Sequence, residues 1–224
     1  MFMLAIETAT DGCSVALLSE GKVTERALQA PREHAARVLG MVDDLVNEAG
    51  LSKESIDAIA YGKGPGSFLG TRIAATVAQS LALTWQAALI PVSSVAALAT
   101  QAYELSGIEH VLVGWDARMQ SIYWGEYHLV DGLMVSDQGD QLTPPDFFHT
   151  FSPDKEVALA GNAWGVYRDE LPSAWSESFV VYHEGLYPKA SGLLPLACVA
   201  FDQGDVVSLA EAVPVYLRHP VDQQ

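Results

Sequence analysis

One pattern occurs twice along this chain and limits the folds that it can adopt. Met3–Glu7 is a short apolar run that ends in an acidic residue, and Val111–Asp116 is a second run of the same kind. Each is followed by a loop, an alternating run that is typical of a strand, and a turn. Two halves that open alike predict a duplicated α/β unit. We therefore expect two related lobes, 1–105 and 106–224, with the terminal helix packing back on the first lobe.

The apolar periodicity predicts an antiparallel opening and then alternating helices and strands. In the first half the expected strands are Met3–Glu7, Cys13–Leu18, Lys22–Leu28, Ile56–Tyr61 and Ala87–Val92, and the expected helices are Glu33–Asn47, Thr71–Trp85 and Ser94–Leu105. In the second half we expect strands at Val111–Trp115, Ser121–Leu129, Leu133–Val135 and Val157–Leu159, a helix at Ser191–Phe201, and a terminal strand or tail at Pro214–Arg218.

The charge balance of the chain excludes two classes of protein. Its 224 residues include 28 acidic and 12 basic side chains, which give a net charge of −16. This charge argues against a protein that grips nucleic acid alone, because each phosphate contact needs a Lys or Arg. It also argues against docking on an anionic membrane surface.

Neither a disulfide framework nor a membrane segment is expected. Cys13 and Cys198 lack the spacing of a redox or zinc motif and are interpreted as buried thiols in a reducing compartment. The uncharged stretch between Arg72 and Glu104 is interrupted by polar side chains and a proline, so we interpret it as helix, strand and helix. The first positive charge is Lys22, which excludes a signal peptide. We predict a soluble, cytoplasmic protein.

The most unusual motif is the glycine loop, Gly62–Gly70, with the sequence GKGPGSFLG. It follows an expected strand and precedes an expected helix, where free N–H groups and the helix dipole make a candidate anion site. The loop lacks the ending of a P-loop, and its glycine spacing is one residue too long for the dinucleotide fingerprint. Phosphate contact through Gly64, Gly66 and Ser67 and a tight structural turn are both open interpretations.

A second candidate loop, Glu7–Gly12, follows the first strand and is rich in acid and hydroxyl groups. Such a loop can hold a magnesium-bound phosphate, with the carboxylate reaching the metal through water, or it can be a polar hairpin turn. The residues open to this role are Glu7, Thr8, Thr10 and Asp11. In the second half Asp116 is a candidate matching acid, although Arg118 nearby favours a simple ion pair.

Signatures of a catalytic nucleophile or a metal site are absent from the sequence. Ser67 does not lie in a G-x-S-x-G elbow, and the six histidines show no H-E-x-x-H or similar spacing. His34, beside an expected helix N-terminus, is typical of a surface or capping residue rather than a ligand. The chain has scaffolding for a phosphate site without the metal, base and nucleophile that chemistry needs, which favours a degenerate enzyme fold used as a partner.

Six motifs together resemble the bacterial TsaB family, also called YeaZ. They are Leu4–Thr10, Cys13–Leu17, Arg32–His34, Gly62–Ile73, Asp116–Arg118 and Pro214–Arg218. The resemblance implies an actin-like, sugar-kinase-type (ASKHA) fold of two related lobes. It also implies a role in making threonylcarbamoyladenosine beside the anticodon of tRNAs that read codons starting with adenine. In that system TsaB is the non-catalytic paralogue of the transferase TsaD, and TsaE, an ATPase, joins them.

The resemblance further implies that this chain binds no catalytic metal. TsaD-type proteins hold a metal through an H-x-x-x-H pair, and the matching positions here are Ser94 and Leu98, which cannot replace histidine ligands. We expect no catalytic residue and no activity of the chain alone. No cofactor should be required, and ATP or ADP would be confined to a site shared with the partner or to a degenerate site on Glu7, Thr8, Thr10, Asp11, Gly64, Gly66 and Ser67.

In the family, partner binding uses helices of the first lobe, which correspond to Glu33–Asn47 and Thr71–Leu83. The second of these is apolar all round, so it is either the central helix of a two-layer domain or a helix with a core face and a subunit face. The candidate interface residues are His34, Val38, Met41, Leu45, Arg72, Ala75, Val77 and Ala78. The expected partners are TsaD, or a second copy of the chain in its absence, together with TsaE, with tRNA bound only through the complex.

Two other classes of function remain as alternatives. One is an ATPase or small kinase that acts alone through Glu7–Asp11 and Gly64–Gly70, and nucleotide turnover by the isolated protein would favour it. The other is a protease that acts on its partner, and a cleavage product that depends on Ser67 or His34 would favour that.

Overall fold

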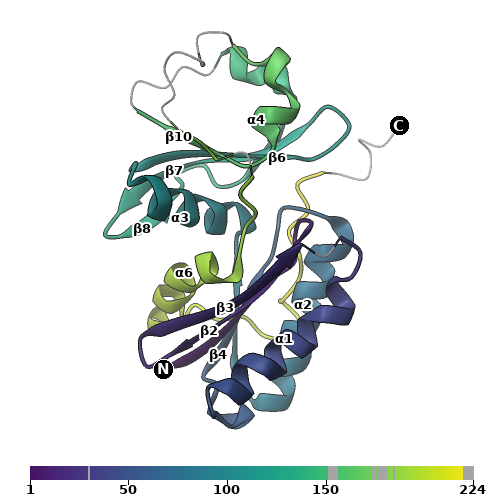
Figure 1. The fold of residues 1–224 in the computed structure, drawn as a ribbon, viewed down its shortest axis with the longest axis vertical. Coiled ribbons are helices and arrows are strands. Elements are labelled where there is room, and N and C mark those ends of the chain that lie inside the picture. Colours follow the sequence, from purple (N-terminus) through teal and green to yellow (C-terminus); the bar gives the residue numbers. More distant parts are fainter. Residues whose placement is uncertain (30, 151–155, 173–174, 176–180, 184, 219–224) are drawn as a thin grey trace. The chain divides into compact units, whose positions relative to one another are not determined.

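The computed structural model describes residues 1–29, 31–150, 156–172, 175, 181–183 and 185–218. The chain forms two compact units (Figure 1). The first unit comprises Met1–Ala97 and Pro188–Val215, and the second comprises Leu98–Tyr187 and the chain from Tyr216 onward. No helix in the described part of the chain has both the length and the apolar character that crossing a membrane requires.

The first unit is built on a five-stranded sheet with the order β3-β2-β1-β4-β5. Its strands are β1 (Phe2–Glu7), β2 (Gly12–Ser19), β3 (Lys22–Gln29), β4 (Ala58–Gly62) and β5 (Ala88–Val92). The β1–β2 and β2–β3 pairs are antiparallel, whereas β4 runs parallel to both β1 and β5. The continuous apolar runs β1 and β4 lie at the centre of the sheet, because helices cover both of its faces there.

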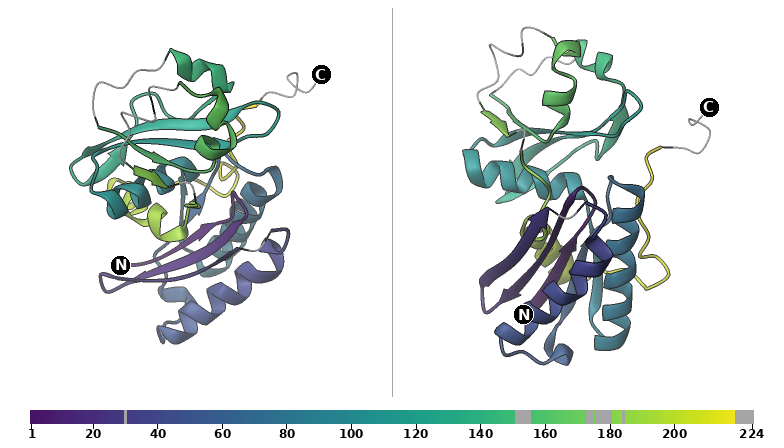
Figure 2. Two further views of the ribbon diagram at one scale, coloured as in Figure 1. Left: turned by 45° about the horizontal axis from the view of Figure 1, so that its top comes forward. Right: turned by 45° about the vertical axis from the view of Figure 1, so that its right-hand side comes forward.

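Helices pack on both faces of this sheet (Figures 1 and 2). The helices are α1 (His34–Glu48), α2 (Phe68–Trp85) and α6 (Ala190–Gln203), and a 3-10 turn, η1 (Lys53–Ser55), precedes β4. α1 and α2 pack on the face that carries Leu4, Val15 and Tyr61. α6 packs on the opposite face, which carries Met3 and Ala5. This alternation follows from the two-residue period of a strand, which sends successive side chains to opposite faces.

The second unit is built on a sheet with the order β11-β10-β6-β7-β8, and β9 pairs with β7. Its strands are β6 (His110–Asp116), β7 (Ile122–Val130), β8 (Leu133–Val135), β9 (Gln141–Thr143), β10 (Ala158–Ala160) and β11 (Val181–His183). Its helices and turns are η2 (Pro145–His149), α4 (Ala163–Val166), η3 (Arg168–Glu170) and most of α3 (Ser94–Ser106). Aromatic side chains dominate its core, with Trp164 and Phe148 fully buried at its centre.

The two sheets share one topology, which confirms the expected duplication. In each, the first three strands pair antiparallel in sequence order, and two further strands run parallel to the first on its other side. Thus β6, β7, β8, β10 and β11 repeat β1, β2, β3, β4 and β5. Two α/β lobes related in this way define the actin-like, sugar-kinase-type fold that the family resemblance implied.

The boundary between the two units differs from the one that the sequence predicted. The first unit ends at Ala97 rather than at 105, so α3 begins in one unit and continues in the other. Pro188–Val215 belongs to the first unit, and its helix α6 packs on the first sheet, which is the arrangement expected of the terminal helix. The reason is burial, because Leu193 and Leu194 of α6 are sealed against the first sheet.

Other elements differ from the sequence prediction at their ends. α2 begins at Phe68 rather than at Thr71, because the hydroxyl of Ser67 accepts a hydrogen bond from the Gly70 N–H and caps the helix. The expected strand or tail at Pro214–Arg218 belongs to neither sheet and forms no helix, and the N–H of Val215 donates to the carbonyl of Lys63.

Candidate functional site

Glu7 ends β1 and has no solvent-exposed surface. Its Oε1 accepts a hydrogen bond of 2.6 Å from the Ala9 N–H, and its Oε2 accepts one of 2.7 Å from the Ser94 hydroxyl. Gly62 at the end of β4 leaves the room that the carboxyl group occupies, because a Cβ on Gly62 would lie 2.0 Å from Oε2. Both oxygens therefore face the protein's own groups.

Burial raises the pKa of Glu7 from its usual 4.5 to about 7. The loss of water around the charged form is the dominant cause. The hydrogen bonds from Ser94 and from the backbone N–H groups of Ala9 and Thr8 act in the opposite direction, because they stabilise the carboxylate. This balance places the titration of Glu7 close to neutral pH.

The glycine loop packs directly on the Glu7–Gly12 loop. The Thr8 hydroxyl donates to the carbonyl of Gly70 at 2.7 Å, and the Ser67 N–H donates to the carbonyl of Ala9 at 2.6 Å. Glycine is required at this contact, because a Cβ on Gly70 would lie 2.0 Å from the Thr8 oxygen and a Cβ on Gly66 would lie 2.3 Å from the Ala9 oxygen.

The start of the glycine loop is tied to two more distant segments. Gly64 has a φ of +90°, a conformation that favours glycine, and its carbonyl accepts the Ser94 N–H at 3.1 Å. The adjacent Lys63 carbonyl accepts the Val215 N–H at 2.8 Å. Sequence reasoning missed these partners of the loop. The position of Ser94, two residues after the end of β5, could have predicted this contact, because the carboxyl ends of parallel strands meet at one edge of a sheet.

The structure brings five of the seven predicted nucleotide-site residues together. They contact one another instead of lining an open site. Glu7, Thr8, Gly64, Gly66 and Ser67 meet where the two loops pack. Thr10 and Asp11 lie farther along the hairpin, where the Thr10 hydroxyl accepts the Gly12 N–H. These residues do not fit a magnesium-bound phosphate, because the carboxylate is buried and the N–H of Ser67 and of Gly70 already donate within the loops.

The positions that correspond to the H-x-x-x-H pair offer no metal ligand. The hydroxyl of Ser94 is used by Glu7, and Leu98 is buried. In the described part of the chain, no three or more His, Cys, Asp or Glu residues are grouped so that they could hold a metal ion.

The predicted interface residues fall into two sets. His34, Val38, Met41 and Leu45 of α1 and Ala75 and Ala78 of α2 are buried in the unit's own interior, so a partner cannot reach these side chains. Arg72 and Val77 are partly exposed. The outward face of α2 is instead formed by Leu69, Arg72, Ile73, Thr76, Val77, Ser80 and Leu83, of which Leu69 is 60% exposed and Leu83 67% exposed.

The outward face of α2 has the character of a contact surface. Its residues recur at helical spacing along the whole 18-residue helix. Arg72 is the single charged residue of α2, and its guanidinium stacks 3.2 Å from the centre of the Phe68 ring. Exposed leucines beside small polar side chains, with little charge, are typical of a surface that another protein covers.

In the second unit, Asp116 occupies the place that Glu7 occupies in the first. Its carboxylate accepts hydrogen bonds from the Tyr167 hydroxyl at 2.7 Å and from the Arg118 N–H at 2.8 Å, and the Arg118 side chain lies 3.3 Å away. The predicted ion pair is therefore present. Burial and the adjacent Asp116 raise the pKa of Tyr167 to about 12. Sequence reasoning did not find Tyr167, which is 51 residues away in the chain.

We call the buried Glu7 carboxyl group and the two loops packed around it the closed acidic site. The fold and the closed acidic site define a class: a duplicated actin-like protein in which the end of the first strand is sealed by the chain itself. The family model described as "TsaD: tRNA N6-adenosine threonylcarbamoyltransferase" matches residues 27–175. The chain is 38% identical to the tRNA threonylcarbamoyladenosine biosynthesis protein TsaB of Escherichia coli, over 99% of this chain and 96% of that protein. It is 34% identical to the TsaB of Haemophilus influenzae, over 98% and 94%.

A solved structure agrees with these relatives. YeaZ from Pseudomonas aeruginosa superposes with a TM-score of 0.90 at 41% identity, over 96% of this chain and 99% of that one. The chain belongs to the TsaB (YeaZ) family, and its place is in the biosynthesis of threonylcarbamoyladenosine in tRNA.

Proposed function

We propose that this chain is a non-catalytic scaffold and activator of the transferase TsaD. TsaD would transfer the threonylcarbamoyl group to the adenosine beside the anticodon of tRNAs that read codons starting with A. The chain would contribute no catalytic residue, require no cofactor of its own and work in the cytoplasm as a subunit of the transferase complex.

The observation that carries this proposal is the closed acidic site. Glu7 stands at the end of β1, in the loop for which a magnesium-bound phosphate and a polar hairpin turn were both open interpretations, and both of its oxygens are satisfied by Ala9 and Ser94. The N–H of Ser67 donates to Ala9 rather than facing outward. A chain that keeps the fold of an enzyme and fills the site with its own atoms is suited to binding a related enzyme rather than to chemistry.

The outward face of α2 is the proposed partner surface. It presents Leu69 and Leu83 without a charged residue between Arg72 and the end of the helix. TsaD would be the principal partner on this face, a second copy of the chain would occupy it in the absence of TsaD, and TsaE would join the pair. Since the net charge is −16, the assembled complex would supply the tRNA contacts. Activation would require that the chain bind the active conformation of TsaD more tightly than the inactive one.

The test is to mix the purified chain with TsaD of the same organism and to measure mass by light scattering behind size exclusion. We expect a new species of heterodimer mass. Replacing Leu69 and Leu83 together with Glu should abolish it, because charge would be buried at the interface. The matched control is Val23→Glu on the edge strand β3, where the side chain is 45% exposed and away from α2.

Three outcomes would contradict the proposal. Two unchanged peaks for the wild-type mixture would remove the scaffold role. Retained pairing of the double Glu variant, with an unchanged circular dichroism spectrum, would remove the α2 surface. ATP turnover by the isolated chain would favour the kinase or ATPase alternative. Ala78 is unsuited to this test, because it is fully buried and a charge there would unfold the unit.

A further inference from the structure

The two edges of the first sheet differ in how they are covered. The strand order places β5 at one edge and β3 at the other. The chain after α6 covers β5, because the Val207 N–H donates to the Leu89 carbonyl at 2.9 Å. In the part of the chain that the structure describes, no backbone hydrogen bond reaches β3 on the side away from β2. An uncovered edge strand is a template on which another strand can pair.

The hairpin between β2 and β3 decides which backbone groups of the edge face outward. Glu20 and Gly21 have φ values of +51° and +78°, as in a type I′ turn. In such a turn the carbonyl of Ser19 accepts the N–H of Lys22, so these two residues form a hydrogen-bonded pair. Hydrogen-bonded and non-hydrogen-bonded pairs then alternate along the antiparallel register. The residues whose N–H and C=O face away from β2 are therefore Val23, Glu25, Ala27 and Gln29.

A groove of about 580 Å³ lies between this open edge and α1. Arg26 and Leu28 of β3 line it on one side, and Ala36, Gly40 and Asp44 of α1 line it on the other. The three helix residues recur every four positions, so one side of α1 faces the edge strand. A Cβ added to Gly40 would meet nothing within 4 Å, which shows that this side of the helix leaves room for another segment.

One end of the groove is apolar. Leu28 is the cross-strand partner of Cys13, and the Cys13 Sγ lies 3.9 Å from the Met41 Sδ, so Leu28 lies close to the middle of α1. Leu28 is 38% exposed, and the neighbouring Gly40 has no side chain to cover it. An apolar side chain at this end would be buried against both.

The other end of the groove is acidic. Arg26 pairs with Glu48 of α1, and its Nε lies 3.9 Å from the carboxylate of Asp44. One arginine therefore stands beside two carboxylates. The side chain of Asp44 is 66% exposed, so it can be reached by a basic group from outside. The net charge of −16 favours the approach of a basic segment over an acidic one.

We propose that the groove between β3 and α1 binds an extended, basic segment of another protein, which adds to the first sheet beside β3. Hydrogen bonds to the outward backbone groups of Glu25 and Ala27 would hold the segment in register. Arg26 and Leu28 mark the two ends of the groove and are two residues apart on one face of β3. The segment would therefore place a basic side chain beside Asp44 and an apolar one, two positions away, beside Leu28.

This groove is separate from the proposed partner surface on α2. α1 packs over β2 and β3, whereas α2 packs over β1, β4 and β5. The groove therefore lies on the side of α1 that faces away from α2. Its occupation does not depend on whether the outward face of α2 binds TsaD.

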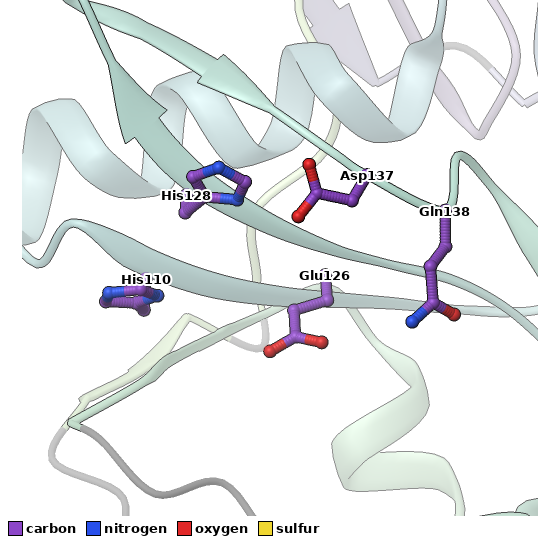
Figure 3. Close-up of a pocket in the computed structure, with 5 residues that line it drawn as sticks. All are labelled: His110, Glu126, His128, Asp137 and Gln138. Atoms are coloured by element: carbon purple, nitrogen blue, oxygen red, sulfur yellow. The ribbon is translucent and has the colours of Figure 1, made fainter.

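The polar pocket of the second unit offers no comparable edge. It has a volume of about 270 Å³ and is lined by His110, Glu126, His128, Asp137 and Gln138 (Figure 3). His110 lies on β6, and Glu126 and His128 lie on β7. Both strands have neighbouring strands on both sides, so an extended segment would find their main chain already paired.

The probe is an acetylated and amidated peptide, labelled with fluorescein, in which Lys-Thr-Val-Thr occurs twice. It presents a basic and a branched apolar side chain two positions apart in either strand direction. The full-length chain is titrated into it, and fluorescence anisotropy is measured. We expect saturable binding, and about tenfold weaker binding of the peptide that has Glu in place of each Lys.

Two variants test the two sides of the groove. Gly40→Leu should weaken binding of the basic peptide by about tenfold or more, because the new side chain fills the groove. Ala35→Leu is its matched control, since Ala35 is an exposed residue of α1 that does not line the groove. Asp44→Lys should reverse the preference in favour of the Glu peptide. Glu54→Lys changes the net charge equally outside the groove and should keep the preference for the basic peptide.

Hydrogen exchange tests the addition of a strand directly. On binding, the exchange of the Glu25 and Ala27 N–H groups should slow, whereas that of Arg26 and Leu28, already paired with β2, should not change. Unchanged exchange at Glu25 and Ala27 would overturn the proposal, as would the absence of binding at about 1 mM peptide.

Self-association of the chain distinguishes a second copy from another protein as the occupant. A self-dimer that persists when Leu69 and Leu83 are replaced with Glu, and that is lost in Gly40→Leu, would assign the groove to a second copy. That result would overturn the proposal. A self-dimer that Gly40→Leu leaves intact agrees with it.

Discussion

Each unit has an acidic residue at the end of the first strand of its sheet, and the two acidic residues have different partners. Glu7 ends β1 without any exposed surface and is held by uncharged donors, the Ala9 N–H and the Ser94 hydroxyl. Asp116 ends β6 with a side chain that is 5% exposed and is held by a phenol and by Arg118, whose own side chain is 83% exposed. One acid is sealed behind a glycine loop, and the other remains beside an exposed cation.

The difference shows that the groups packed around the end of each first strand set the surroundings of its acid. Without a nearby cation, burial raises the pKa of Glu7 to about 7. Asp116 has an arginine within 3.3 Å. Duplication therefore preserved the backbone arrangement, while the side chains around each strand end decide what the acid can do.

The strongest test of this comparison is the pH dependence of Glu7→Gln. The folded state holds the proton of Glu7 to about pH 7, whereas the unfolded chain releases it near 4.5. Stability from this group is therefore complete below pH 4.5 and is lost as pH rises to about 7. The difference in pKa corresponds to about 3 kcal/mol, at about 1.4 kcal/mol for each pKa unit.

Urea unfolding at pH 5 and pH 8 measures this effect. Relative to the wild type, Glu7→Gln should gain stability between the two pH values, because glutamine does not titrate. Glu54→Gln, an exposed carboxylate in the same unit, serves as control and should show no such gain. A constant difference between Glu7→Gln and the wild type across this pH range would refute the assignment.

The next largest effect is expected for Gly70→Ala. Its Cβ would lie 2.0 Å from the backbone oxygen of Thr8, which cannot move without displacing the Glu7–Gly12 loop. We expect a loss of about 2 kcal/mol or more in unfolding free energy. Gly40→Ala in α1 is the matched control, since nothing lies within 4 Å of its Cβ, and it should stabilise the helix by about 0.5–1 kcal/mol. Equal melting temperatures for both variants would show that the two loops are not in close contact.

In the second unit a smaller effect is expected for Tyr167→Phe. The change removes the 2.7 Å hydrogen bond from the phenol to Asp116 and leaves the ring in place. The expected cost is about 1.5 kcal/mol, because the acceptor is a carboxylate. Chemical denaturation measures it, and spectroscopic titration should show that a tyrosine with a pKa near 12 disappears. If the variant is as stable as the wild type, the hydrogen bond between Tyr167 and Asp116 does not contribute to the stability of the unit.

The smallest effect is expected for Arg118→Ala. Its ion pair with Asp116 is exposed on the arginine side, so its loss should cost less than about 0.5 kcal/mol. Thermal unfolding at low and at high salt measures it, and the small difference from the wild type should shrink as salt screens the pair. A cost as large as that of Tyr167→Phe would mean that the arginine, rather than the phenol, holds Asp116 in place.

The residues of the candidate site could be predicted from the sequence, but the contacts that close the site could not. Glu7 and the glycine loop stood out because an acid after a strand and glycines before a helix are local patterns. Their mutual contact was not predictable, since Ser94 lies 87 residues from Glu7 and the Thr8 hydroxyl meets a carbonyl 62 residues away. For the same reason the sequence analysis chose interface residues of α2 that are buried. The small Ala75 and Ala78 are buried where the helix meets the sheet closely, and the larger Leu83 is exposed.

The sequence by itself determined the strands, most of the helices and the duplication, because periods of two and 3.6 residues and the turn residues act over short distances. Its motifs also determined the family. Only the tertiary structure decided that α3 begins in one unit and continues in the other, that the acidic site is closed, and which face of α2 remains outside. These features depend on packing between distant segments, where the space left beside each side chain decides whether it is buried, bonded or exposed.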